Sequence, residues 1–404
     1  MKHSVSRNLI NQGSTEKEMN LSLWPSVYFS SVVLCVKTRF KKKGINFQKV
    51  TANYILIITL FNSLISQTIF GQTQDADYKI EFVKSEFIFQ NPPFKACHAS
   101  TIAELSNKRL MTAWFGGSYE GAPDVGIWTS VYDDNEWSKP VELVSSSLND
   151  SVKLPCWNPV LFKTAKGKLC LFYKQGKNPR EWWGVVITSA NDGKSWSAPV
   201  LLPKGFLGPI KNKPVQLPSG EILCPSSTES IGSDQWKAHM EITDETLSKW
   251  QTVAVDTSNV FGVIQPAILV HPNGKLQLLC RSRENCVVQS WSTDKGQHWS
   301  NLSKTEVPNP NSGIDAVTLS NGLHILVNNP LLKGQDWFNG RNVLNVMVSK
   351  DGIHWREVYV LEKEKEGEFS YPAIIQSSDG EVHITYTMNR TNIKHVVLNI
   401  DLKK

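Results

Sequence analysis

The 404-residue sequence lacks the apolar spacing of three to four residues that marks amphipathic helices. It has no low-complexity linker, and its formal net charge of +6 is not gathered into a Lys/Arg-rich patch with interleaved aromatic residues. A helical fold and a nucleic-acid partner are therefore not expected. Apolar residues make up 40% of the chain, which is enough for one sizeable all-β domain. Because such a domain needs no partner to complete its core, we expect a monomer with no stable membrane partner.

Cysteine is scarce, with seven in the chain, and no C-x-x-C or Cys/His cluster of the kind that holds zinc is present. Six of the seven lie mostly in or beside apolar runs, which predicts buried free thiols and not a disulfide framework. These six are Cys97, Cys156, Cys170, Cys224, Cys280 and Cys286. No other metal-ligand spacing stands out, so we expect neither a metal nor a cofactor.

Long hydrophobic runs are also missing, apart from one candidate near the N-terminus. Lysines at 41–43 precede an apolar stretch at 54–70 that is interrupted by polar residues. A positive segment before a short apolar one is the pattern of a signal peptide. A transmembrane anchor is the alternative, although the run is short for a full span. We therefore predict an overlong gene start or disordered leader over 1–40, a signal peptide over 41–72, and a periplasmic or secreted domain over 73–404.

What the sequence does have is a repeated unit, which is clearest at residues 265–299. Short strand-like runs alternate there with Gly, Pro, Asn and Asp clusters, as they do in antiparallel hairpins. The unit ends in Ser292-Thr-Asp294-Lys-Gly296-Gln-His-Trp299, which has the form Ser-x-Asp-x-Gly-x-x-Trp. In this form a short polar side chain can bond back onto a tight turn while the Trp packs beneath the hairpin.

The ending recurs at 189–196 and, one residue short, at 349–355, with degraded copies at 133–137 and 244–250. The final tryptophans are 49 to 59 residues apart, which suits one four-stranded propeller blade. Each unit also has a head, which is a polar residue that begins an apolar strand before a turn. The heads are His98, Asn158, Lys213, Gln265, Asp315 and Tyr371. Six heads predict an all-β, six-bladed β-propeller.

The innermost strand of each propeller blade lines the central channel, so the six heads should ring one mouth of it. Unlike polar residues at one equivalent position are hard to explain by packing, and we predict the functional site there. At the two ends of the domain, the segments Tyr78 to Phe89 and Lys394 to Leu402 both look like strands. Pairing them in the last blade would close the ring without leaving an edge.

The repeats with their Ser-x-Asp-x-Gly-x-x-Trp turns resemble the sialidase (neuraminidase) superfamily of propellers over roughly Phe94 to Tyr386. The segments at 98–101, 114–126, 155–159 and 210–214 are most similar to a branch known as predicted neuraminidases. The resemblance implies a carboxylate clamp of three arginines, a Tyr nucleophile activated by a Glu, and an Asp that acts as acid and base.

Carried over residue by residue, the resemblance implies that Tyr371 is the nucleophile and that Arg281 and Arg341 are the second and third arginines of the clamp. The acid/base group would come from the loop after the first inner strands. Its candidates are Glu120, which we favour for chemistry, and Asp124, whose residue type commonly caps turns.

Two positions depart from the family, since His98 stands where the first arginine would be and Gln265 where the activating Glu would be. A phenol is a weak nucleophile at neutral pH without a neighbouring base, so the second departure bears on the reaction. Gln265, Asn158, Lys213 and Asp315 are candidates for binding the substrate at the channel mouth. Aromatic side chains that could stack on sugar faces are Trp157, Trp182, Trp183 and Trp337.

The first hypothesis is an exported glycoside hydrolase for an acidic glycan that contains a sialic-acid-like or uronate sugar. The second is a polysaccharide lyase, in which an arginine neutralises a uronate carboxylate while His98 and Tyr371 share the proton transfers. The third is a propeller that binds glycans without turnover. All three imply an acidic glycan as the partner.

Overall fold

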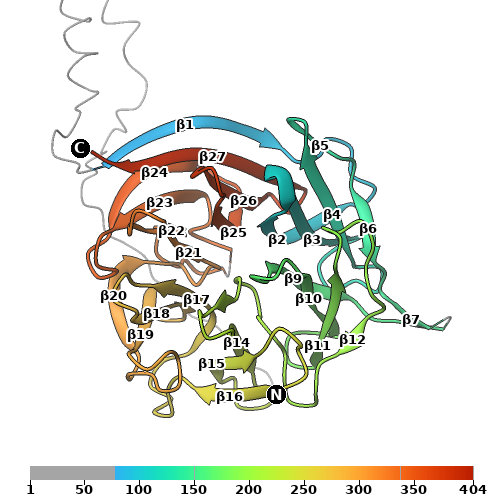
Figure 1. The fold of residues 1–404 in the computed structure, drawn as a ribbon, viewed down its shortest axis with the longest axis horizontal. Coiled ribbons are helices and arrows are strands. Elements are labelled where there is room, and N and C mark those ends of the chain that lie inside the picture. The colour runs from blue at the N-terminus through green and yellow to red at the C-terminus, as the bar shows by residue number, and fades with distance from the viewer. Residues whose placement is uncertain (1–77, 150, 337, 404) are drawn as a thin grey trace, which may run out of the picture. The chain divides into compact units, whose positions relative to one another are not determined.

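The computed structural model describes residues 78–149, 151–336 and 338–403. In this part of the chain the elements are β-strands and one short 3-10 turn, η1 (Ser106–Lys108). Six antiparallel sheets of four or five strands stand side by side around a common centre (Figure 1). The predicted all-β, six-bladed β-propeller is therefore confirmed. The leader and signal peptide predicted over 1–72 lie outside the described residues, among which no helix is long and apolar enough to cross a membrane.

Each blade consists of strands that follow one another along the chain, except the last. The first blade contains β2 (Ala96–Glu104), β3 (Leu110–Gly117), β4 (Gly126–Asp133), β5 (Glu136–Trp137) and β6 (Val141–Val144). The second contains β9 (Cys156–Lys163), β10 (Leu169–Gly176), β11 (Trp182–Ser189) and β12 (Val200–Leu201). The third contains β13 (Val215–Gln216), β14 (Ile222–Glu229), β15 (Trp236–Thr243) and β16 (Trp250–Ala254).

The remaining blades have the same pattern. The fourth contains β17 (Val263–Val270), β18 (Leu276–Ser282), β19 (Cys286–Ser292) and β20 (Ser303–Pro308). The fifth contains β21 (Asp315–Thr318), β22 (His324–Asn328), β23 (Val343–Ser349) and β24 (Arg356–Lys363). The sixth contains β25 (Phe369–Gln376), β26 (Val382–Met388), β27 (Asn392–Leu402) and β1 (Tyr78–Phe87). A small hairpin of β7 (Ser147–Asn149) and β8 (Val152–Lys153) lies between the first two blades in sequence.

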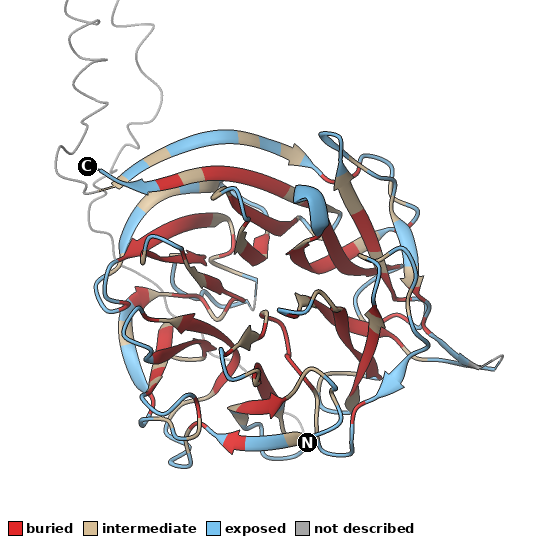
Figure 2. Ribbon diagram, viewed as in Figure 1, coloured by how far each residue is buried: buried red, intermediate tan, exposed pale blue. Residues whose placement is uncertain are grey.

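The inner strands are buried on both faces because neighbouring blades pack their apolar sides together. All eight residues of β10 are buried, whereas both residues of the outermost strand β12 are exposed (Figure 2). The first two blades share an apolar cluster that includes Ala113, Ile127, Leu161 and Leu171. The six cysteines of the described chain are free and five of them are buried, as predicted. The core thus lies between the blades.

The turn from Ser292 to Trp299 has the hydrogen bonds that its sequence predicts. Ser292 Oγ donates to Asp294 Oδ1 at 2.8 Å and accepts from the backbone N–H of Gly296 at 2.9 Å. Trp299 Nε1 donates to the carbonyl of Gly296 at 3.1 Å. The same contacts recur in the second and fifth blades. Because these turns join the third strand of a blade to its fourth, they stabilise the outer part of the propeller.

The ring closes in the sixth blade, where the first strand of the domain pairs with the last. β1 runs antiparallel to β27, with Tyr78 opposite Leu402 and Phe87 opposite Lys394, and it covers β27 from outside (Figure 1). The predicted closure is therefore confirmed. Without β1, the long strand β27 would be an unpaired sheet edge.

A buried chain of polar groups connects β1, β27 and β26. His395 Nδ1 lies 3.0 Å from Glu86 Oε1, and His395 Nε2 lies 3.1 Å from His383 Nδ1. Burial lowers the pKa of His383 to about 3 and also lowers that of His395. Two neutral imidazoles can each donate once and accept once along this chain. Partial burial opposes ionisation of Glu86, yet hydrogen bonds from His395 and Lys84 hold its pKa at about 2.

We expect the domain to lose stability as the pH falls below about 6.5, the ordinary pKa of histidine. The folded protein keeps His383 neutral down to a pKa of about 3, whereas the unfolded chain protonates it. The unfolded state therefore binds more protons in this window, which lowers the free energy of unfolding by up to about 1.4 kcal/mol per pH unit for each such group. Melting temperatures between neutral and mildly acidic pH test this. His383→Gln should flatten the dependence, and equal slopes in both proteins would contradict the prediction.

Candidate functional site

The backbone is strained where several blades begin. Asn158, Gln265 and Tyr371 have positive φ values of 38°, 53° and 53°, and Ala99, next to His98, has a φ of 58°. The strand pairing also shifts register at these places. A non-glycine residue in this region costs about 1 to 3 kcal/mol and persists only where its surroundings require it. Such strain is often kept at functional sites, and three of these four residues line one cavity.

This cavity, called the site cavity below, has a volume of about 270 Å³. Its walls come from the first strands of the second, fourth and sixth blades, and from the loops between second and third strands with the adjoining ends of those strands. The lining residues are Glu120, Trp157, Asn158, Pro179, Trp182, Glu229, Trp236, Ile264, Gln265, Arg281, Arg341, Tyr371 and Arg390. Every blade contributes at least one of them. Three of the six heads, Asn158, Gln265 and Tyr371, therefore line a cavity to which polar groups converge.

The phenol oxygen of Tyr371 lies in a small hydrogen-bonded group. Arg281 Nη1 donates to it at 2.7 Å and Gln265 Nε2 donates to it at 3.2 Å. The same Arg281 nitrogen lies 3.2 Å from Gln265 Oε1, and Arg281 Nε donates to Asn311 at 2.8 Å. The phenol oxygen thus accepts two hydrogen bonds, which stabilise negative charge on it and leave its own hydrogen for another acceptor. The structure brings these three predicted site residues into direct contact.

Arg281 is a buried cation, with 9% of its surface exposed. Its hydrogen-bond partners are neutral groups, and no carboxylate among the described residues forms an ion pair with it. Its guanidinium carbon lies 5.4 Å from the ring centroid of Trp236, a cation-π contact. Burying a charge without an opposite charge in contact is costly. The positive charge of Arg281 therefore favours the binding of an anion in the site cavity.

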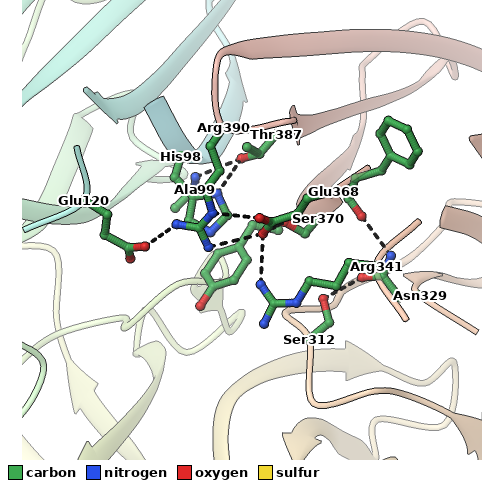
Figure 3. A network of polar contacts seen from close by, with 12 residues as sticks. His98, Ala99, Glu120, Ser312, Asn329, Arg341, Glu368, Ser370, Thr387 and Arg390 are labelled. Carbon is green, nitrogen blue, oxygen red and sulfur yellow. Dashed lines mark hydrogen bonds and ion pairs between the residues drawn. The ribbon is translucent and has the colours of Figure 1, made fainter. Parts of the chain in front are cut away.

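A second polar group holds two more arginines. Glu368 accepts hydrogen bonds from Arg341 Nη1 at 2.9 Å, Arg390 Nε at 2.7 Å and Ser370 Oγ at 2.8 Å. Figure 3 shows Glu368 between the two arginines and Glu120 paired with the other side of Arg390. Burial alone would raise the pKa of Glu368, but Arg390 and Arg341 hold it below its ordinary value. Glu368 is thus ionised, and it holds the guanidinium groups of Arg341 and Arg390 at the cavity.

The three cavity arginines occupy corresponding places in three consecutive blades. Arg281 is near the end of the second strand of the fourth blade, while Arg341 and Arg390 lie between second and third strands of the fifth and sixth. Sequence reasoning found the first two and missed Arg390, because it aligned each head with its turn and looked for the remaining arginine at His98. The missed signal was the recurrence of arginine at this place in successive repeats.

Three other site residues were also missed, for a different reason. Glu368 precedes the sixth head, and Glu229 and Trp236 flank the loop between β14 and β15. None of them belongs to a motif or to the ring of heads. Glu368 binds Arg341 and Arg390, while Trp236 contacts both Arg281 and Glu229, and these contacts depend on the folded ring.

His98 packs behind Tyr371 and is not among the described residues that line the site cavity. It is 2% exposed, its Nδ1 lies 3.0 Å from Thr387 Oγ1, and its ring centroid lies 4.1 Å from that of Tyr371. Burial, followed by the charges of Arg390 and Arg341, lowers the pKa of His98 well below its usual value. The imidazole is therefore neutral, and its catalytic role stays a prediction.

Two of the predicted binding residues pair with each other. Lys213 Nζ lies 3.0 Å from Asp315 Oδ2, which also accepts from the backbone N–H of Ile374 at 2.9 Å. Nearby, Lys211 Nζ donates to the carbonyl of Ile314 at 2.8 Å. These contacts connect the inner strands of different blades. The described residues that line the site cavity include none of these side chains, so contact of Lys213 and Asp315 with substrate stays a prediction.

The two acid/base candidates have different surroundings. Asp124 accepts hydrogen bonds from Ser118 Oγ at 2.6 Å and from the Ser118 backbone N–H at 3.1 Å. These bonds lower the pKa of Asp124 and cap the loop. Glu120 lines the site cavity and pairs with Arg390. The structure thus places Glu120, and not Asp124, among the described residues at the cavity wall.

The tryptophans that were predicted to stack on sugars do not all line the site cavity. Trp157, Asn158 and Trp182 line the site cavity, and the rings of the two tryptophans meet edge to face with centroids 6.0 Å apart. Trp183 packs against the apolar cluster between the first two blades and lines a second, adjoining cavity instead of this one. Successive residues of a strand point to opposite faces, which explains why the neighbouring tryptophans differ. Trp337 lies outside the described residues.

One group among the described residues has metal-ligand atoms close together. The atoms of Asp379, Glu381 and His383 lie within 4.8 Å of one another. Both ring nitrogens of His383 already make hydrogen bonds, to Ser377 at 3.0 Å and to His395 at 3.1 Å. None of these residues lines the site cavity. We therefore assign no metal or cofactor role to them.

Comparison with known proteins gives matches in sequence and in structure. A profile described as a BNR repeat-like domain matches residues 108–384. The anhydrosialidase of Macrobdella decora is 23% identical over 184 residues, which cover 42% of this chain and 23% of that protein. The chain thus matches about a quarter of the length of that curated relative.

Solved structures with a similar fold include sialidases. A Dyadobacter fermentans protein of unknown function aligns with a TM-score of 0.65 and 15% identity, covering 80% of this chain and 99% of that one. The NanB sialidase of Streptococcus pneumoniae aligns with a TM-score of 0.62 and 14% identity, covering 78% and 70%. A Trypanosoma rangeli sialidase aligns with a TM-score of 0.60 and 16% identity, covering 80% and 59%. At such identities the likeness shows the fold alone.

Proposed function

This chain belongs to the family of BNR repeat-like domains, and from that premise we propose that it is a glycosidase that releases a carboxylate-bearing sugar from a glycan. The sugar would be sialic-acid-like or a uronate. An anhydrosialidase and several sialidases are among the proteins to which the chain is similar, which supports a glycan as substrate.

The observation that carries the proposal is the buried Arg281 guanidinium, which lacks a contacting carboxylate in the described chain and lies beside Tyr371. Arg341 and Arg390 reach the same cavity and share the carboxylate of Glu368. Guanidinium groups bind carboxylates through two parallel hydrogen bonds. The carboxylate of Glu368 already binds Arg341 and Arg390. Arg281 is therefore the primary partner that we assign to the carboxylate of the sugar.

In the reaction, we assign to Tyr371 the attack on the anomeric carbon. Hydrogen bonds from Arg281 and Gln265 stabilise the charge that develops on its oxygen. An amide cannot accept the phenol proton as a carboxylate would, so Gln265 does not act as the base. Among the described residues, the carboxyl groups that line the cavity are those of Glu120 and Glu229, and we assign the proton transfers to them.

The lyase alternative receives less support from the geometry. It needs both His98 and Tyr371 at the substrate, one as base and the other as acid, and His98 is buried behind Tyr371 with Nδ1 at Thr387. The hydrolase needs only groups at the cavity wall. We also propose that the protein meets its substrate outside the cytoplasm, because residues 41–72 have the pattern of a signal peptide.

Digestion of acidic glycans by the purified protein tests the proposal. Sialyllactose and uronate-containing polysaccharides are incubated with it while ultraviolet absorbance and released monosaccharide are followed together, and lactose serves as the neutral control. We expect an acidic monosaccharide to appear without a rise in absorbance. A rise in absorbance would indicate an unsaturated uronate and replace the hydrolase with a lyase, and binding without any product would leave a glycan-binding propeller.

A further inference from the structure

A second cavity, of about 320 Å³, adjoins the site cavity and is called the neighbouring cavity below. The two cavities share Pro179, Trp182 and Glu229 in their walls. Leu202 and Phe206 add apolar surface to the neighbouring cavity. In a glycosidase, the bond that is cut lies between the sugar that is held and the part of the glycan that leaves. The shared wall is where a glycan that occupies both cavities would place that bond.

Glu229 is held in the shared wall by a single side-chain contact. Trp236 Nε1 donates to Glu229 Oε2 at 3.1 Å, and no group of the described chain donates to Oε1. The same indole ring lies 5.4 Å from the guanidinium carbon of Arg281, which in turn donates to Tyr371. Trp236 therefore contacts both the carboxyl group of Glu229 and Arg281, the arginine that donates to the attacking phenol. One oxygen of Glu229 remains available to a substrate.

The two carboxyl groups of the site cavity have unlike surroundings. Burial raises the pKa of Glu229 above its ordinary value, although the charge of Arg281 partly opposes this. Glu120 instead forms an ion pair with Arg390. Carboxyl groups in such different environments take different roles in acid/base catalysis, one giving a proton and the other taking one. The surroundings of Glu229 suit the group that gives the proton.

We propose that Glu229 is the catalytic residue that protonates the leaving oxygen, and that the neighbouring cavity binds the part of the glycan that leaves. This inference rests on the proposed glycosidase function. First, Tyr371 bonds to the anomeric carbon and passes its proton to Glu120, while the bridging oxygen separates with the proton of Glu229. Water then bonds to the anomeric carbon and gives a proton to Glu229, while the phenol oxygen leaves and recovers its proton from Glu120. One water is consumed, and all three side chains are restored.

The shared wall also indicates what the leaving part is. Trp182 offers aromatic surface at the junction, with Phe206 beyond it in the neighbouring cavity. Aromatic rings pack against the apolar faces of sugar rings, and a cavity of this size holds more than a small alcohol. The leaving part is therefore a further sugar residue of an oligosaccharide.

Substrates with different leaving groups test both halves of the inference. Fluoride leaves with little need for a proton and does not fill the neighbouring cavity. Lactose, as a leaving group, needs a proton on its oxygen and occupies that cavity. Sialyl fluoride and sialyllactose are compared, or glucuronyl fluoride and a glucuronosyl oligosaccharide if uronate is the sugar released. Glu229→Gln should reduce kcat/KM on the oligosaccharide by about 100-fold to 10,000-fold, and on the fluoride by less than about tenfold. It should also remove the alkaline limb of the pH profile for the oligosaccharide.

A cavity-filling variant and a matched control complete the experiment. Thr228→Trp adds bulk to the neighbouring cavity, whose wall includes Thr228, and should raise KM for the oligosaccharide only. Glu284 pairs with Lys304 at 3.1 Å and lines neither cavity, so Glu284→Gln should behave as wild type. Equal losses of Glu229→Gln on both substrates would overturn the inference while leaving the glycosidase intact. Failure of the wild-type protein to cleave either substrate would overturn the proposed function, and this inference with it.

Discussion

Arg281→Met should reduce kcat/KM for the acidic glycan by about 30-fold to 5,000-fold, because the sugar carboxylate would lose the partner assigned to it. This range corresponds to the about 2 to 5 kcal/mol that truncating one side of a buried charge pair costs. The loss should be confined to substrates that carry the charge. Wild type and variant should therefore differ little on the methyl ester of the same glycan, which has no carboxylate to bind.

The same variant should change the free energy of unfolding by less than about 2 kcal/mol. Arg281 is buried without a contacting carboxylate among the described residues, so removing its charge relieves a desolvation cost that offsets the hydrogen bonds lost at Tyr371, Gln265 and Asn311. Arg109→Met is the control, since Arg109 lies near Asp133 at 3.9 Å and Asp192 at 3.7 Å and does not line the site cavity. Unchanged kcat/KM in Arg281→Met, or equal losses on the acid and its ester, would remove Arg281 from carboxylate binding.

Tyr371→Phe should lower turnover of the acidic glycan by about 100-fold to 10,000-fold, because the ring remains while the attacking oxygen is lost. Packing against His98 is kept, since that contact is between rings. The variant leaves the donors of Arg281 and Gln265 without their acceptor, so the free energy of unfolding should fall by about 1 to 3 kcal/mol. Single-turnover rates and thermal unfolding measure the two effects separately.

The chain provides a matched control in Tyr386→Phe. Tyr386 is fully buried, and its hydroxyl donates to Glu362 at 2.7 Å. Removing this hydroxyl should cost a similar free energy of unfolding, but Tyr386 does not line the site cavity and turnover should not change. If Tyr371→Phe kept turnover within about tenfold of wild type, as a group outside the chemistry would, the phenol could not be the nucleophile.

The fold could be predicted because its signals are local. The Ser-x-Asp-x-Gly-x-x-Trp turn is held by hydrogen bonds within eight residues, such as those of Ser292 and Trp299, so a short stretch of sequence is enough to predict it. The spacing of successive turns along the chain then predicts the number of blades. The pairing of β1 with β27 also followed from sequence, because a closed ring with six heads needs a partner for its last strand.

The site was predictable where it coincided with those repeats. Tyr371 and Gln265 are heads, and Arg281 stands at a fixed distance from a turn, so aligning the repeats brought them together. Lys213 and Asp315 are heads as well, yet they pair with each other, because the opposite charges of a head in the third blade and a head in the fifth meet at the centre of the ring. Position in the ring therefore placed these residues near the centre without deciding which of them line the cavity.

The six-bladed architecture and the ring of polar heads could be inferred from the sequence, since turns and strand repeats depend on contacts over short stretches of chain. Which charges meet could be learned from the folded ring alone. Glu120 and Arg390 are 270 residues apart and form an ion pair, and Glu368 joins arginines from two blades. Whether a charged side chain is paired or available to a ligand depends on which side chains lie beside it once the ring has closed.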